Sequence, residues 1–596
     1  MKPAKQDAAR LKIHNDYRQR RPLDKGLEAQ TVDLTVNQKD FAVHLPASME
    51  IPFNMTRWGE NEQTGQRCVD FMQKDNGAFY YNWSLYSAGH AKNVPTLIKK
   101  DLFINRDPDG ILFGDSGGFQ AAVGSGVHGD MDWSHIPSVD DLCQKTLDWL
   151  EATSNYSMIL DLPTFVLGKN DKIVSHEQCL QQTMYNIEYF LAHREPGKTN
   201  FLNVLQGLDE HDTDEWYNAV KKFNNPETVL DQEYYYIPLA QMPNPIEPKE
   251  VAKPEKLSEN SSLAEEEKFK EDEKKYKKYR VELNLYKKAL KRKPETLASI
   301  VDIDGFKYIK AKSPWVKKFG SNTKLGDRAL EGWAMSGHMV HNVDLALRQF
   351  CILLRDGNID DRQHWVHMLG LATMKAAVTL TAIQRKIRTL PGCENFVISY
   401  DSSSASQFMQ FGKMIIGAYS DPVSKVATFT LWKPPADYGS CGSKQLIKDS
   451  LAYHDANQPK EKELRTDLKK NEIRFETYVM NNISVGDLCY KLPTEPGNRP
   501  WDTTSNSFVY CQNVEAIIRS FQWINEMADA DRTDVVEPEL LDFKNRIIHE
   551  IFSDPDPVQA VTHYQTIIRP LFAKEIIPNK CSSHHNVLNN NDLFGW

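Results

Sequence analysis

The chain has 596 residues, of which 40% are hydrophobic and 26% are charged, and its formal net charge is −9. This length predicts two or three domains with a large buried core. No apolar run reaches the ~18–20 residues of a membrane span, and the negative charge excludes a protein that coats polyanions over its whole surface. Any contact with nucleic acid must therefore use a local patch.

The amino terminus and the cysteines both favour a cytoplasmic protein. Residues 1–21 are polar and basic and lack the apolar core of a secretory signal. The nine cysteines are scattered, without a CxC or CxxC pair. This spacing predicts reduced, mostly buried thiols rather than a disulfide framework or a cysteine zinc site.

Short apolar runs that end in glycine or a polar residue recur along the chain, with helix-like stretches between them. Six such runs lie at residues 110–115, 156–161, 201–206, 332–337, 365–370 and 395–401. Strands that alternate with helices predict a parallel sheet with both faces covered. The alternation alone fits either a (β/α)8 barrel or a doubly wound open sheet. After residue 401 we expect a mainly helical region, with helices near 514–528 and 537–552.

The segment at residues 248–294 differs from the rest of the chain. Its first half, residues 255–273, carries more acidic than basic residues, and its second half, residues 274–293, is strongly basic. Tyrosines and leucines recur in the basic half at steps of three and four residues, which is typical of one face of a helix. We expect either an exposed helical insertion or a solvated loop.

Residues 114–120 read GDSGGFQ and follow one of the apolar runs. Trypsin-like proteases carry their nucleophile in GDSGG, but that triad needs a histidine and an aspartate within a preceding β-barrel. The histidines before Ser116 are His14, His44 and His90, and Phe119 stands where the proteases have proline. Most of the chain follows the serine, so a serine protease fits poorly.

The stretch DSGGFQ after an apolar strand resembles the tRNA-guanine transglycosylase family, whose (β/α)8 enzymes exchange guanine for a 7-deazaguanine. Further matches follow in order along the chain. Asp161 resembles a second base-reading aspartate, and residues 205–207, LQG, resemble the family's VQG strand end. GWAMSG at 332–337 and HMLG at 367–370 resemble two more segments, and Asp401 falls where the family places its nucleophile. The resemblance covers roughly residues 78–420 and implies a (β/α)8 TIM barrel.

Three departures separate this chain from the enzymes that act on tRNA. Those enzymes bind zinc through a CxCxxC…H site after the nucleophile, and no such cysteines exist here. The residues after Asp401 are serine-rich, and the insertion between Gln206 and Gly337 is longer than usual. These departures resemble the DpdA branch, which installs 7-deazaguanines in DNA and thereby protects it from restriction. We identify the chain as a member of that branch, from a phage, which would place it in the host cytoplasm.

The resemblance assigns the two chemical roles to two carboxylates. Asp401 would attack the sugar C1′ and hold it as a covalent intermediate. Asp115 would protonate the departing guanine and deprotonate the incoming base. Either aspartate could instead be an ordinary turn or helix-capping residue. The reaction requires neither a cofactor nor a metal.

The base is expected to be held by side chains and backbone groups at the strand ends. Asp161 would accept hydrogen bonds from guanine N1–H and the 2-amino group, and Gln206 and the Gly337 N–H would donate to O6. Phe119 and Leu369 would stack on the ring, where aromatic stacking contributes ~1–3 kcal/mol. The expected base-binding residues are Ser116, Phe119, Gln120, Asp161, Gln206, Gly337 and Leu369.

The expected partners are DNA and a free 7-deazaguanine base such as preQ0, with no membrane and with a homodimer left open. Lys274, Lys275, Lys277 and Lys278 form the densest basic stretch and are the candidate nucleic-acid contacts. Two alternatives remain: a tRNA enzyme without zinc, and an inactive barrel that serves as a nucleic-acid-binding subunit. The histidine pairs 338/341, 364/367 and 584/585 lack a third ligand at a recognisable spacing, so we expect no zinc there.

These expectations divide the chain into four parts. Residues 1–75 lead into the barrel, residues 76–435 form it, residues 248–294 are its charged helical insertion, and residues 436–596 are a mainly helical extension.

Overall fold

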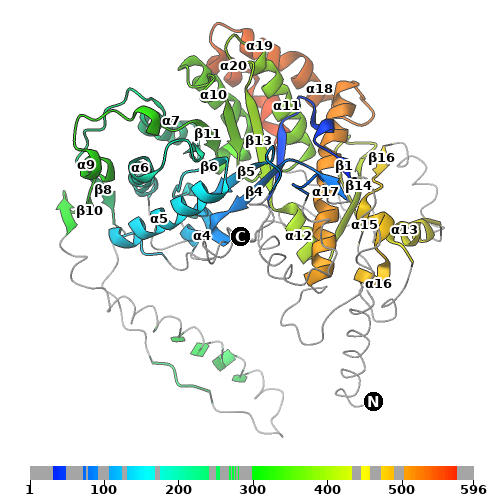
Figure 1. Cartoon of the computed structure of the whole chain (residues 1–596), viewed down its shortest axis with the longest axis horizontal. Helices are drawn as coiled ribbons and strands as arrows, with labels where there is room; N and C mark the ends of the chain where they lie inside the picture. The colour runs from blue at the N-terminus through cyan, green and yellow to red at the C-terminus, as the bar shows by residue number, and fades with distance from the viewer. Residues whose placement is uncertain are drawn as a thin grey trace.

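The computed structural model describes most of the chain (Figure 1). The described residues are 31–47, 71–74, 78–90, 106–123, 131–167, 173, 175–239, 250–254, 299–432, 445–456, 471–488 and 503–572, together with 268, 269, 271–273, 275, 276, 279, 280 and 283. Within this part of the chain, every helix is too short or too polar to traverse a lipid bilayer.

Eight parallel strands form the centre of the molecule. They are β2 (Val43–Pro46), β4 (Trp83–Ser87), β5 (Ile111–Asp115), β6 (Tyr156–Met158), β7 (Asn200–Leu205), β11 (Gly332–Met335), β12 (Trp365–Met368) and β13 (Val397–Ser402). Their order is β2-β13-β12-β11-β7-β6-β5-β4, and all neighbours pair in parallel. A bridge between Ala47 and Leu85 joins the two end strands, and Ser84 Oγ donates to Pro46 O at 2.9 Å. The sheet is therefore a nearly closed barrel and not a doubly wound open sheet.

All six predicted strands belong to this barrel. The two further strands, β2 and β4, complete it, and β2 lies before the domain boundary that was expected at residue 76. A short parallel pair, β1 (Val32–Asp33) and β3 (Phe79–Tyr80), precedes the barrel wall.

Helices follow the strands and cover the outside of the barrel (Figure 1). They are α4 (Gly118–Val123), α5 (Ile136–Thr153), α6 (His176–His193), α7 (Glu210–Val220), α10 (Val343–Arg355), α11 (Met374–Arg388) and α12 (Ser404–Gln410). The side chains of Ser175, Asp209 and Thr373 cap α6, α7 and α11 by accepting backbone N–H groups of the first turn.

Aromatic side chains fill the barrel interior. The ring of Phe113 on β5 lies 5.2 Å from Tyr156 on β6, 5.0 Å from Trp365 on β12 and 5.6 Å from His367 on β12. Because β12 is not a neighbour of β5, these contacts cross the interior. Side chains alternate along a strand, so Asp115 shares the inward face of Phe113, and Asp401 shares the inward face of Ser399.

The connection between β7 and β11 contains a three-stranded antiparallel sheet of β8 (Tyr234–Pro238), β10 (Phe306–Lys312) and β9 (Ile300–Ile303), followed by α9 (Pro314–Phe319). The charged segment leaves from β8 and returns to β9. Its described residues between 268 and 283 are helical.

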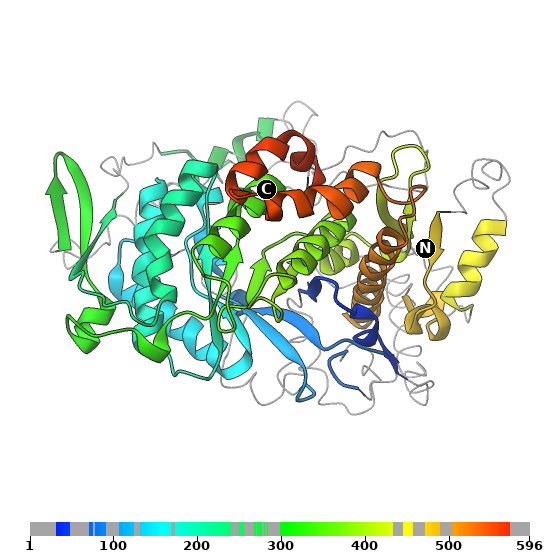
Figure 2. The ribbon, with the colours of Figure 1, turned by 90° about the horizontal axis from the view of Figure 1, so that it is seen from above.

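The carboxy-terminal part is mainly helical, as predicted. Its helices are α13 (Ile447–Ala456), α15 (Tyr478–Asn482), α16 (Val485–Leu488), α17 (Thr503–Asp529), α18 (Pro538–Asp542), α19 (Ile548–Ser553) and α20 (Pro557–Ile568). It also contains a small sheet, which was not predicted, of β14 (Met414–Ser420), β15 (Ala427–Trp432) and β16 (Glu472–Arg474). The β8–β10 sheet and α13 lie at opposite ends of the molecule (Figure 2).

The long helix α17 packs against the barrel wall. Phe521 contacts the rings of His44 on β2 and Tyr400 on β13. Asn513 donates to the carbonyls of Ala405 and Lys413, which ties α17 to the segment that follows β13. All described cysteines are buried, and Cys143, Cys179, Cys351 and Cys393 are free thiols.

Candidate functional site

The predicted site residues lie at the carboxyl ends of the barrel strands. Asp115 is the last residue of β5, and Asp401 is the last but one of β13. Asp161, Gln206 and Gly337 follow β6, β7 and β11 within three residues. In a (β/α)8 barrel this end carries the loops that form active sites. Five strands therefore bring these residues to one mouth of the barrel.

Asp161 and Gln206 form a buried pair at this mouth. Gln206 Nε2 donates to Asp161 Oδ2 at 2.6 Å. Gln206 is 0% exposed and Asp161 is 8% exposed. Burial raises the pKa of Asp161 to about 7; the hydrogen bond from Gln206 opposes the shift, and the negative charge of Asp115 adds to it. A carboxyl with this pKa changes its charge near neutral pH. The pair is thus a titrating group next to a second carboxylate.

Two glycines allow the neighbouring loops to approach this pair. A Cβ on Gly118 would lie 2.6 Å from the Asp161 carbonyl oxygen and 3.0 Å from Asp161 Oδ1. A Cβ on Gly337, whose φ is +63°, would lie 2.9 Å from Gln206 Oε1. Both positions exclude a side chain, because such distances are shorter than van der Waals contact. The second glycine of DSGGFQ and the last glycine of GWAMSG are therefore explained by the packing of the site itself.

Asp401 is held by one of its two carboxylate oxygens. The Gly370 N–H donates to Oδ1 at 2.6 Å, and His367 Nε2 lies 3.3 Å from the same oxygen. Among the described residues, Oδ2 has no hydrogen-bonding partner. The Asp401 side chain is 13% exposed, whereas that of His367 is completely buried. The carboxylate is thus fixed by the described residues through Oδ1 alone.

A chain of buried groups fixes the tautomer of His367. Trp365 Nε1 donates to Ser399 Oγ at 2.9 Å, and Ser399 Oγ lies 2.9 Å from His367 Nδ1. The indole can only donate, and the buried serine hydroxyl needs an acceptor, which His367 Nδ1 provides. With Nδ1 as the acceptor, the proton-bearing ring nitrogen is Nε2, which lies on the side of Asp401. His367 and Ser399 are functional candidates that the sequence analysis did not select.

The remaining predicted base-binding residues occupy several positions around the mouth. Phe119 is half-buried, and its ring stacks on Phe165 with centroids 5.1 Å apart and planes at 18°. Leu369 is half-buried and its N–H donates to Met335 O. Gln120 lies against Gly89. Ser116 is 1% exposed, which does not suit an accessible nucleophile.

The structure describes only part of the predicted basic arm. Lys275 pairs with Glu271 at 2.8 Å and lies 4.0 Å from Asp272. The rings of Tyr276 and Tyr279 lie 6.3 Å apart. Lys274, Lys277 and Lys278 lie outside the described residues.

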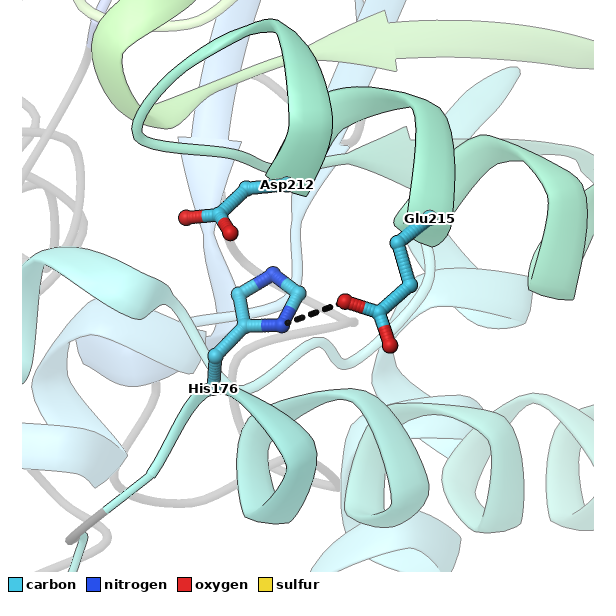
Figure 3. A group of neighbouring side chains, drawn as sticks. All are labelled: His176, Asp212 and Glu215. Carbon is cyan, nitrogen blue, oxygen red and sulfur yellow. Dashed lines mark ion pairs between the residues drawn. The ribbon is translucent and has the colours of Figure 1, made fainter.

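Within the described part of the chain, one group of side chains could hold a metal ion, although the sequence predicted no metal site. His176 in the first turn of α6 faces Asp212 and Glu215 of α7, and their ligand atoms lie within 4.8 Å of one another (Figure 3). His176 Nδ1 is 3.5 Å from Glu215 Oε2, so an ion pair between the two helices already accounts for much of this geometry. Two histidines of the pairs noted in the sequence contact backbone carbonyl oxygens: His364 Nδ1 contacts Asp361 O, and His338 Nδ1 contacts Leu208 O.

No protein-family model matches the chain, and no curated protein matches it.

Proposed function

We propose that this chain replaces guanine in DNA by a 7-deazaguanine through a covalent aspartyl-deoxyribosyl intermediate. The observation that supports it best is the pair of separate carboxylate sites at one barrel mouth. One site is Asp401, fixed through Oδ1. The other is the group formed by Asp115, Asp161 and Gln206. Base exchange needs these two functions, a nucleophile for the sugar and a proton-handling site for the base.

The proposed reaction has two displacement steps at C1′. Oδ2 of Asp401 attacks C1′ and the C1′–N9 bond breaks, while Asp115, which is ionised in the free protein and takes up a proton before this step, gives that proton to the departing guanine. The incoming base then returns a proton from its N9 to Asp115, and N9 attacks C1′ and releases Asp401. Each bond broken at C1′ is replaced by another, and no oxidant, reductant or metal takes part.

The buried pair suits recognition of the guanine edge. Ionised Asp161 can accept from N1–H and the 2-amino group, and Gln206 orients it by a hydrogen bond at 2.6 Å. The side-chain amide of Gln206 has a second N–H that can donate to guanine O6. Gly118 and Gly337 leave room only for backbone beside the pair, which favours a flat ligand held against main chain.

DNA rather than tRNA is proposed because of the missing cysteine zinc site, the serines after Asp401 and the long connection between β7 and β11. A guanine in a duplex must be flipped out at a cost of a few kcal/mol, so extra contacts are needed. A base in a tRNA loop is already unstacked.

The test is nucleoside mass spectrometry of DNA and tRNA from cells that express the chain and make a 7-deazaguanine base. The proposal expects 7-deazaguanine in DNA and not in tRNA, and none in cells that express the matched Asp401→Asn variant. Modification of tRNA alone would establish the zinc-free tRNA enzyme instead. Unmodified DNA and tRNA would favour the inactive binding subunit.

Binding of the free base should weaken as the pH falls through about 7. The pKa of Asp161 is raised to about 7 by burial, and the ionised form accepts the guanine edge, so the competent fraction rises with pH. Below the pKa, affinity should drop about tenfold per pH unit. Calorimetric titration of the base between about pH 5.5 and 8 measures this dependence.

The Asp161→Asn variant is the control for this pH profile. Its amide does not titrate, so its weak residual binding should be independent of pH over the same range. A flat profile in the wild-type protein would contradict the assigned role of Asp161.

A further inference from the structure

The sheet formed by β8, β9 and β10 has one face packed on α6. Tyr235, Ile237, Ile309 and Ala311 point to this face and are buried. The Tyr235 hydroxyl donates to Glu188 Oε1 on α6 at 2.5 Å. The sheet is therefore firmly attached to the barrel, and its second face is directed away from α6.

The outer face of this sheet is aromatic and basic. Pairing places Lys312 opposite Tyr234, Lys310 opposite Tyr236, and Phe306 opposite Ile303 on the same face. Phe306 is 58% exposed, Ile303 41% and Tyr236 39%. Polar residues normally occupy the solvated face of an antiparallel sheet, so a face that exposes Tyr236, Ile303 and Phe306 and leaves Tyr308 half-buried indicates a binding surface.

The charges on this outer face favour an anionic partner. Lys310 and Lys312 are exposed and form no ion pair with a described residue, and Lys310 Nζ lies 4.1 Å from the ring centroid of Tyr234. The acidic side chain of β9, Asp302, pairs with Lys307 and alternates to the opposite face. The outer face therefore joins aromatic rings with two lysines that no described carboxylate pairs with.

The spacing of the rings favours an extended ligand. Tyr236 pairs with Lys310, and Lys310 lies four residues after Phe306 in β10. The rings of Phe306 and Tyr236 are therefore separated by about 14 Å along the strand direction. Tyr308 lies between them on the same face. Stacking positions spread over this length suit successive bases of a polymer better than a single free base.

We propose that the outer face of the β8–β10 sheet binds single-stranded polynucleotide, with bases stacked on Tyr236, Tyr308 and Phe306 and phosphates at Lys310 and Lys312. Stacking on exposed aromatic residues together with lysine contacts to the backbone is how sheet surfaces bind single strands without sequence preference. This site goes beyond base exchange and does not depend on it, because oligothymidylate, which contains no guanine, should bind.

The experiment measures fluorescence polarisation of labelled oligothymidylate with the full chain. The Tyr236→Ala/Phe306→Ala double variant should bind at least about tenfold more weakly, since loss of one stacked base costs about 5- to 150-fold. The matched control is Phe411→Ala, which removes an equally exposed phenylalanine, 55% against 58%, and should leave affinity unchanged. Thermal melting of each variant confirms that it is folded.

A second variant, Lys310→Gln/Lys312→Gln, tests the charges independently of the rings. Two lost phosphate contacts should reduce the slope of log affinity against log salt by about 1.4 for a single strand. Photocrosslinking with 5-iodouracil in the oligonucleotide should label peptides that contain Tyr236 or Phe306.

Three results would overturn the proposal: unchanged affinity in the aromatic double variant, an unchanged salt slope in the lysine variant, or crosslinks confined to other peptides. A wild-type dimer that the aromatic variant converts to a monomer, at constant oligonucleotide affinity, would assign the face to self-association instead. The Asp401→Asn variant should bind oligothymidylate normally, so failure of base exchange and failure of this site are distinguishable.

Discussion

Replacing Asp401 by alanine is expected to abolish base exchange while binding of nucleic acid survives. The Gly370 N–H holds the carboxylate through Oδ1, and His367 Nε2 lies 3.3 Å from the same oxygen, which leaves Oδ2 as the attacking atom. Without it no covalent intermediate can form, and none of the remaining groups can hold the sugar at C1′. Wild-type protein should form a denaturant-resistant adduct with labelled DNA, and the variant should form none.

Asp421→Ala is a suitable control for this experiment, because Asp421 caps a loop beyond β14 through the N–H groups of Val423 and Ser424. It should keep both the adduct and turnover. Full exchange activity in Asp401→Ala would refute the assignment of the nucleophile. Loss of DNA binding together with activity would show that the variant had lost its fold, which thermal melting would reveal.

Removal of the Ser399 hydroxyl should impair catalysis without affecting DNA binding. In Ser399→Ala, His367 Nδ1 loses its donor, so the imidazole is no longer held in the tautomer that directs Nε2–H toward Asp401. A lost hydrogen bond of this kind contributes about 1 kcal/mol, so kcat should fall about fivefold at unchanged KM. Ser399→Thr, which keeps a hydroxyl, should retain more activity. Equal kcat in the wild type and Ser399→Ala would contradict this positioning role.

The sequence predicted six barrel strands because each is a compact apolar run with an abrupt polar end. It did not reveal β2 and β4, for a physical reason. His44 in the middle of β2 reads as a polar interruption, yet it is buried against Phe521 of α17, hundreds of residues away. In β4, the serines at 84 and 87 break the apolar pattern, but Ser84 bonds across the barrel seam to Pro46. Long-range burial of this kind leaves no local signal.

The candidate site was predictable as a list of residues but not as an arrangement. Asp115, Asp161 and Asp401 could be selected because each ends an apolar run. The pairing of Asp161 with Gln206 and the need for glycine at 118 depend on contacts between different loops. His367 was set aside as one of a histidine pair. Its contact with Asp401 arises from the register of β12 on β13, which places it opposite Ser399.

Phe119 shows the same limit. The sequence paired it with Leu369 as the two sides of a base-stacking slot, and in the structure its stacked partner is Phe165, which follows Asp161 by four residues. The sequence around Phe119 does not indicate which aromatic residue its ring stacks on. The Phe119–Phe165 stack joins the segments that directly follow Asp115 and Asp161.

Asp115→Asn should lower turnover about 10²–10⁴-fold with little change in DNA affinity, because the amide cannot transfer the proton to the departing guanine. In the wild type, the Gly117 N–H donates to Asp115 Oδ1 at 3.2 Å. Asparagine has the same shape, and its side-chain carbonyl can accept the same hydrogen bond. Single-turnover exchange of labelled guanine measures the loss, and Asp141→Asn on the exposed face of α5 is the matched control, with full activity expected.

The same variant gives a second readout that a merely structural role would not produce. The charge of Asp115 helps to raise the pKa of Asp161, so its removal should move the pH midpoint of base binding downward from about 7. The base would then bind better at mildly acidic pH while exchange is nearly lost. Turnover above a tenth of the wild-type rate, or an unmoved midpoint, would show that Asp115 is not the proton-transfer partner of this pair.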